Sequence, residues 1–90
     1  MINYEPFWTT LKEKGITKYQ LIYHWGISSN TLRRMKHNEA ISSTTLNELC
    51  LILDCKISEV MDFNATIEEL QKTEKKRFEI KNKAKNKNPR

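Results

Sequence analysis

The sequence predicts an all-α fold, and three observations support that prediction. Only two glycines and two prolines interrupt the 90 residues, and such scarcity favours helices joined by short turns over a sheet with many hairpins. Apolar residues recur at helical spacing in successive segments. No segment alternates convincingly between apolar and polar residues, as a half-buried strand would.

Five short helices are predicted before Asn64. Thr17 and Ser28 are typical N-cap residues, and Gly15 stands where a helix C-terminus favours a residue that tolerates positive φ. Pro6 suits a first helical turn. The predicted helices cover residues 5–14, 17–24, 28–36, a segment from Ser43 or Thr44 to Leu53, and a short turn at 58–61.

The composition changes after Asn64, so we divide the chain into a head (residues 1–64) and a charged tail (residues 65–90). Thr66 and Glu69 form a capping-box pattern that predicts a sixth helix. The whole net charge of +5 lies in residues 67–90, where nine basic residues face four acidic ones. Beyond Ile80 the tail has five basic residues and no acidic one, and we expect that end to be frayed or disordered.

Several classes of protein fit poorly. No stretch resembles a secretory signal or is apolar enough to span a membrane, so a cytoplasmic, nucleoid-associated protein is expected. Cys50, Cys55, His24 and His37 match no zinc spacing, and buried thiols are the expected state of the two cysteines. No phosphate loop or catalytic group is recognisable. We therefore expect no cofactor, no metal and no enzymatic activity.

The segment from Thr17 to His37 is the most informative. Leu21, Ile27, Leu32 and Met35 are spaced so that two short helices pack across a turn at Gly26. The outward side of the second helix carries Ser, Asn, Arg and Lys, with no acidic and no large apolar residue. Such a helix suits the major groove, where these groups hydrogen-bond base edges and phosphates.

With this order of residues, the run from about Trp8 to Phe63 resembles the Cro/C1-type (XRE-like) helix-turn-helix regulators of bacteria and phages. Further matching features are the Ser/Thr-rich helix start at residues 42–45 and the ending TLNELCLILDCKISEVMDF. The resemblance implies a five-helix lambda-repressor-like DNA-binding domain and double-stranded DNA as partner.

The resemblance also implies site residues. Base contacts are expected from Ser28, Ser29, Asn30, Arg33 and Arg34. Backbone contacts are expected from Lys18, Tyr19, Lys36, Ser42, Ser43, Thr44 and Thr45.

Two positions depart from the family pattern. Ile22 stands where a small residue is usual, so the two helices are expected to lie slightly further apart. Lys36-His37-Asn38 replaces Glu-Asn-Gly, although Asn38 still suits a left-handed C-cap. The aromatic residues Trp8, Tyr19, Tyr23 and Trp25 could indicate base stacking, as in proteins that bind single strands, but for Trp25 we favour packing between helices.

The sequence therefore favours a transcriptional regulator, with repression of a promoter as the expected action, that binds a palindromic site as a homodimer. An antitoxin-like or adaptor module that binds a protein is the alternative, and general nucleic-acid coating by the tail is a third. Whether the tail dimerises, clamps DNA or only aids solubility stays open. Glu74 interrupts the Ile67–Leu70–Phe78 stripe, and the sequence does not decide whether this stripe dimerises or packs back on the head.

Overall fold

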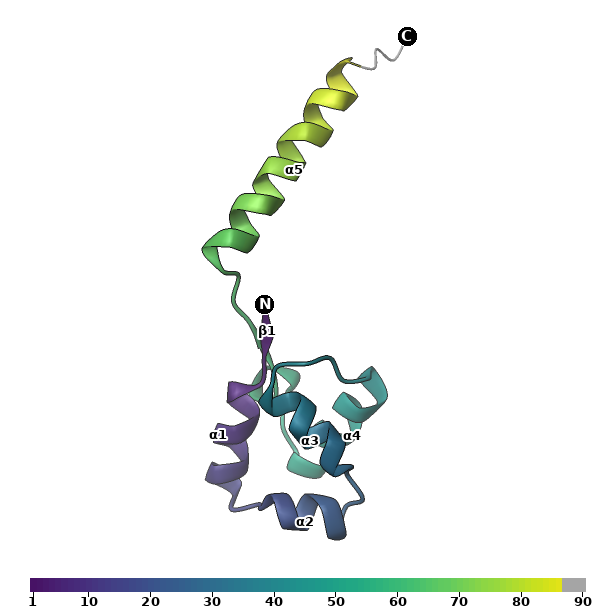
Figure 1. Cartoon of the computed structure of the whole chain (residues 1–90). Helices are drawn as coiled ribbons and strands as arrows, with labels where there is room; N and C mark the ends of the chain where they lie inside the picture. Colours follow the sequence, from purple (N-terminus) through teal and green to yellow (C-terminus); the bar gives the residue numbers. More distant parts are fainter. Residues whose placement is uncertain (87–90) are drawn as a thin grey trace.

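The computed structural model describes residues 1–86, and its fold is a small helical head from which one long helix projects (Figure 1). The elements are β1 (Ile2–Asn3), α1 (Glu5–Lys14), α2 (Lys18–Tyr23), α3 (Ser29–Lys36), α4 (Ser43–Leu53), the 3-10 turn η1 (Ile57–Glu59), β2 (Asp62–Phe63) and α5 (Ile67–Asn86). The all-α prediction is confirmed, and the predicted helices of the head lie close to the observed ones.

The head has one hydrophobic core, to which all its helices contribute. The buried core residues are Tyr4, Phe7, Leu11, Leu21, Ile27, Leu32, Met35, Leu49, Leu53 and Val60. Thr10 is the buried polar residue among these helices, and its hydroxyl donates a 2.7 Å hydrogen bond to the carbonyl of Glu59. That bond fixes α1 against η1. Within the described residues, every buried side-chain polar group has a hydrogen-bond partner.

A two-stranded antiparallel ladder, which the sequence did not predict, joins the N-terminus to the end of the head. Ile2 pairs with Phe63 and Asn3 with Asp62. Each strand has only two residues, too few for alternation to be read, and the pairing joins segments about sixty positions apart, so no local signal marks it. Phe63 lies in this ladder, and its side chain is exposed.

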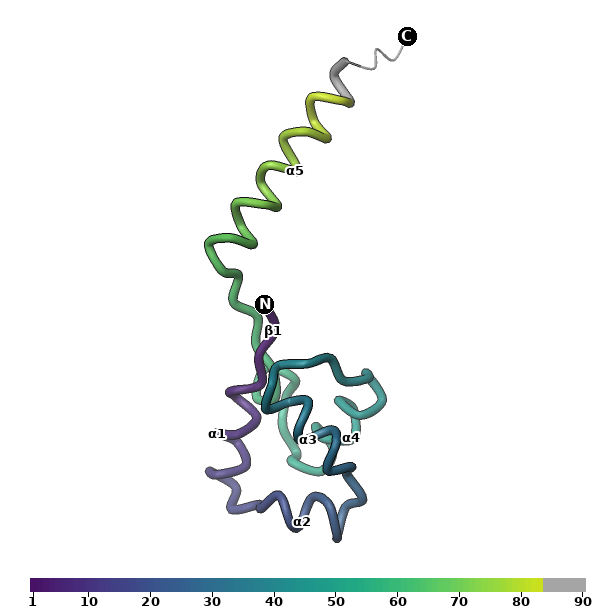
Figure 2. Tube along the Cα trace, viewed as in Figure 1, coloured from purple at the N-terminus to yellow at the C-terminus, as the bar shows by residue number. Residues whose placement is uncertain are grey.

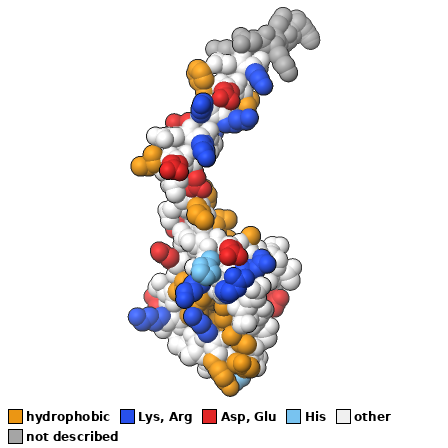
Figure 3. Space-filling model, viewed as in Figure 1, with side chains coloured by type: hydrophobic (Ala, Val, Ile, Leu, Met, Phe, Trp, Pro, Cys, Tyr) orange, Lys and Arg blue, Asp and Glu red, His pale blue; other side chains and the backbone are white. Residues whose placement is uncertain are grey.

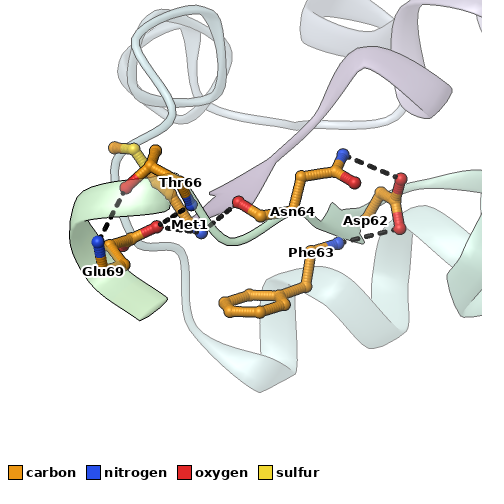
Figure 4. A network of polar contacts seen from close by, with 6 residues as sticks. All are labelled: Met1, Asp62, Phe63, Asn64, Thr66 and Glu69. Carbon is orange, nitrogen blue, oxygen red and sulfur yellow. Dashed lines mark hydrogen bonds and ion pairs between the residues drawn. The ribbon is translucent and has the colours of Figure 1, made fainter. Parts of the chain in front are cut away.

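The start of α5 is fixed to this ladder by a network of polar contacts (Figure 4). The Thr66 hydroxyl accepts a hydrogen bond from the Glu69 N–H at 3.0 Å, and the Glu69 carboxylate accepts one from the Thr66 N–H at 2.9 Å. The predicted capping box is therefore present. The Met1 ammonium group adds contacts to Glu69 Oε1, at 2.8 Å, and to the carbonyl oxygen of Asn64.

From this anchor α5 runs away from the head (Figure 2). It has 20 residues, and each residue from 67 to 83 is exposed. The expectation of a frayed end beyond Ile80 was wrong for residues 81–86, which continue the helix. Lysine is a good helix former, and Glu79 and Lys83 have the i,i+4 spacing that stabilises an exposed helix. Residues 87–90, on which the same expectation falls, lie outside the described residues.

The apolar residues of α5 do not pack back on the head. Ile67 is 73% exposed, Leu70 53% and Phe78 66%. Within the described residues, no helix is long and apolar enough to cross a membrane.

Candidate nucleic-acid interface

The pair α2 and α3 is held together across a tight turn at Gly26. Thr17 caps α2 reciprocally with Gln20, because each side chain accepts a hydrogen bond from the other residue's N–H, at 3.1 and 3.0 Å. After the turn, the N–H of Ile27 donates to the carbonyl of Leu21 at 2.9 Å. Since Leu21 and Ile27 are both buried, the turn is fixed by packing as well as by hydrogen bonds.

Helix α3 presents one face to the core and the other to solvent. Leu32 and Met35 anchor it in the core, and Ser28 caps it by accepting a 3.1 Å hydrogen bond from the N–H of Asn30. All the proposed groove residues lie on its exposed side: Ser28, Ser29, Asn30, Arg33, Arg34 and Lys36. Basic side chains gather on this face of the head (Figure 3). The structure therefore brings together the residues expected to touch bases.

Arg33 is held in place before any ligand binds. Its Nε and one terminal nitrogen donate to Oδ1 of Asn30 at 3.1 and 2.8 Å. Its other terminal nitrogen lies 4.0 Å from Oε2 of Glu39. Neither contact was predicted from the sequence, although the i,i+3 spacing of Asn30 and Arg33 could have indicated the first. Glu39 places a carboxylate at the edge of this otherwise acid-free face.

Helix α2 exposes a cation and an aromatic ring at its start, and it exposes a second aromatic ring at its end. Lys18 Nζ lies 5.2 Å from the centroid of the Trp8 ring, a cation–π contact that holds the ammonium beside α1. Tyr19 is 65% exposed, and its ring centroid lies 4.6 Å from that of Tyr23. The predicted backbone-contact residues Lys18 and Tyr19 thus reach solvent from adjacent positions. No sequence signal pointed to the Trp8 contact.

The start of α4 supplies the remaining predicted residues. Ser42 is the N-cap, and its oxygen accepts from the N–H of Thr45 at 3.1 Å and donates to the Thr45 hydroxyl at 3.0 Å. Both hydroxyls therefore have partners. Ser43 and Thr44, by contrast, are exposed in the first turn and leave their hydroxyls to solvent.

Ile22 and Asn38, the departures from the family pattern, have clear places in the structure. Ile22 is half-buried and packs against the core. Asn38 adopts a left-handed φ of 56°, as expected for a C-cap, and its Oδ1 also accepts a hydrogen bond from the N–H of Tyr4 at 3.3 Å. The preferred interpretation of Trp25 was wrong: its side chain is 54% exposed and is not packed between the helices, because the tight turn leaves it pointing outward.

Cys50 and Cys55 lie together at the C-terminus of α4. They are half-buried free thiols rather than fully buried ones, and the N–H of Cys55 donates to the carbonyl of Cys50 at 3.1 Å. Burial raises the pKa of the Cys55 thiol, and the neighbouring Cys50 and Glu59 act in the same direction. Such a thiol is a poor nucleophile at neutral pH.

Comparison with known proteins agrees with this geometry. The Cro/C1-type HTH DNA-binding domain family matches residues 7–66. The crystal structure of the transcriptional regulator VanUg (form II) is similar, with a TM-score of 0.62 and 26% sequence identity. The alignment covers 68% of this chain and 81% of that chain. No curated protein matches the sequence. With a helix-turn-helix at α2 and α3 and a family match that spans most of its length, the chain belongs to the Cro/C1-type HTH DNA-binding domain family.

Proposed function

We propose that this protein is a sequence-specific regulator of transcription that reads double-stranded DNA with α3 in the major groove. The main observation that supports this proposal is the exposed face of α3, which presents Asn30, Arg33 and Arg34. Leu32 and Met35 fix this helix to the core. Arginine and asparagine are the side chains that most often make paired hydrogen bonds to guanine and adenine edges. A rigid helix that presents them matches how helix-turn-helix proteins read sequence.

Two groups of residues flank α3 and suit phosphate contact. The first group is Lys18 and Tyr19, at the start of α2. The second is the N-terminal turn of α4, which offers backbone N–H groups and the hydroxyls of Ser43 and Thr44. We assign the hydroxyls of Ser42 and Thr45 to capping α4 first, because they already bond to each other. Lys36 adds a cation at the end of α3. These contacts would fix orientation without reading sequence.

The protein is proposed to act as a homodimer on an inverted repeat. One α3 helix reads only a few base pairs, so two copies on half-sites about one helical turn apart gain both affinity and specificity. We propose repression by occupying a promoter as its action.

A second candidate function is binding to a different protein, as an antitoxin-like partner or an adaptor. The observation that favours it is the set of exposed apolar residues on α5. The two functions are compatible, because a protein that binds a partner through α5 keeps α3 free.

A random-site selection on the full chain tests the main proposal. The wild-type protein is expected to select an inverted repeat, and the variant with Arg33→Ala and Arg34→Ala should lose this selectivity while its helical circular dichroism is unchanged. The matched control carries Lys12→Ala and Lys56→Ala, because it also removes two exposed positive charges but lies outside α2, α3 and α4. Selection of the same sites by the double variant would overturn the assignment of α3.

A further inference from the structure

The apolar face of α5 has nothing in its own chain to cover it. Ile67 and Phe78 are eleven positions apart, which is close to three helical turns, so they lie on one face with Leu70 beside them. All three are more than half exposed. Most helices in proteins gain their stability by packing such a face against another part of the protein. The uncovered face of α5 therefore suits contact with another molecule.

The anchor at the head keeps α5 from folding back. Met1 and Thr66 both contact Glu69, which fixes the first turn of α5 to the β1–β2 ladder (Figure 4). The helix then leads away from the head for its whole length (Figure 1). Its apolar face is therefore available to another molecule rather than to its own core.

The charges along α5 indicate which molecule that is. Residues 67–74 contain three acidic residues and one basic residue, whereas residues 75–86 contain six basic residues and one acidic residue. Charged side chains of both signs surround the apolar ones (Figure 3). A helix that is acidic in its first part and basic in its second is complementary to a second copy of itself running in the opposite direction.

We propose that α5 pairs antiparallel with α5 of a second copy of this chain. This proposal rests on the proposed function, because it identifies an interface for the homodimer proposed there. When Ile67 lies beside Phe78 of the other copy, Glu74 lies level with the neutral Gln71 and not with another carboxylate. A parallel pair would instead place Glu74 against Glu74 and Arg77 against Arg77, which like-charge repulsion disfavours.

The symmetry of this pair suits the DNA site. Two identical antiparallel helices are related by a twofold axis perpendicular to them, which is an isologous contact. The same kind of axis relates the halves of an inverted repeat. Contact with DNA alone would use the basic part of α5 but would leave Ile67, Leu70 and Phe78 in water. A second copy of α5 would cover these apolar side chains as well as meet the charges.

Sedimentation equilibrium of the full chain without DNA tests the pairing. The wild-type protein should reach a dimer as concentration rises, and the variant with Leu70→Ser and Phe78→Ser should raise the dimer dissociation constant by about tenfold or more. The matched control is Lys72→Ser with Glu79→Ser, which alters the far face of α5 at constant net charge. The control should dimerise like the wild type. A monomeric wild type, or equal dissociation constants for the two variants, would overturn the proposal.

Cross-linking tests the direction. In a chain with Cys50→Ala and Cys55→Ala, one sample carries Gln71→Cys and another carries Glu74→Cys. On mixing and mild oxidation, disulfides between unlike chains should predominate, because the two positions are level in the antiparallel pair. Predominance of like–like disulfides would overturn the antiparallel arrangement. These measurements contain no DNA, so their failure is separate from retained DNA selectivity in the α3 variants, which would count against the proposed function alone.

Discussion

Asn30 and Arg33 act as a unit on the surface of α3. Two hydrogen bonds to one amide oxygen hold the guanidinium group in a fixed direction, with Glu39 at its far side. An arginine ordered before binding loses less conformational entropy when it meets a base. At the residue scale, we therefore expect recognition of the DNA sequence by Arg33 to depend on Asn30, even if Asn30 itself touches no base.

Replacing Asn30 with Ala is expected to weaken binding to the selected site by about 1–3 kcal/mol, the usual range for one paired base contact. Binding to unrelated DNA should change far less, because phosphate contacts are untouched. Fluorescence anisotropy with the selected duplex and a scrambled duplex measures both. Asn47→Ala is the comparison variant, because it removes another exposed amide that lies outside the proposed contact residues. An equal loss on both duplexes would mean that Asn30 contributes only to general affinity.

Gly26 fixes the angle of the helix-turn-helix through its backbone alone. Its φ is +73°, and a Cβ added there would meet no atom within 4 Å. At the element scale, Gly26→Ala should therefore cost about 1–2 kcal/mol of unfolding free energy, from left-handed strain without any clash. Urea unfolding measures this cost.

Gly15→Ala is the matched control for Gly26→Ala, because Gly15 has a φ of +68° and equally open surroundings. Both variants should be destabilised to a similar extent. Only Gly26→Ala should also reduce DNA selectivity, because only Gly26 sets the angle between α2 and α3. Equal selectivity in the two variants would show that the turn tolerates the strain without moving α3.

The start of α5 is expected to depend on pH through Glu69. The Met1 ammonium, followed by the N–H of Thr66, lowers the pKa of this carboxyl below its usual value of 4.5. Since the folded pKa lies below the unfolded one, the carboxylate stabilises the first turn of α5 above the unfolded pKa. That contribution is lost as the pH falls through the folded pKa.

Carbon-detected NMR of the Glu69 carboxyl should show a midpoint below 4.5. The N–H of Leu70 donates to the Thr66 carbonyl at 3.0 Å. Its protection against exchange, relative to the intrinsic rate at the same pH, should fall as the pH drops through that midpoint. Glu69→Gln removes the titrating group and should abolish this pH dependence. A midpoint at or above the usual value would contradict the ammonium contact.

For the whole molecule, the distribution of charge matters more than its sum. The head, residues 1–64, has seven basic and seven acidic residues, so the DNA binding that we propose rests on the local placement of charges on α3 and not on net charge. If the end of the tail also clamps DNA, deleting residues 81–90 should weaken binding evenly across sequences. It should also flatten the salt dependence, by about 0.9 in slope for each phosphate that the tail no longer neutralises. An unchanged slope in salt titrations would limit those residues to a role in solubility.

Much of this molecule could be predicted from short stretches of sequence. The caps at Thr17, Ser28 and Thr66, the turn at Gly26 and the apolar spacing of Leu21, Leu32 and Met35 placed the helices and the exposed side of α3. These signals are local, because a cap or a helical face involves residues only three or four positions apart. For that reason the residues expected to touch bases were found together on the exposed side of α3.

The tertiary structure decided what depends on distant contacts. Only the folded chain brings Ile2 beside Phe63, Lys18 over Trp8 and Met1 to Glu69, and only it shows that Trp25 and the apolar face of α5 are exposed. Exposure is set by where the rest of the chain lies, and no spacing within one segment records that. The sequence by itself thus predicted which helix exposes the groups that we propose to read DNA, and the fold determined that α5 projects from the head with its apolar side uncovered.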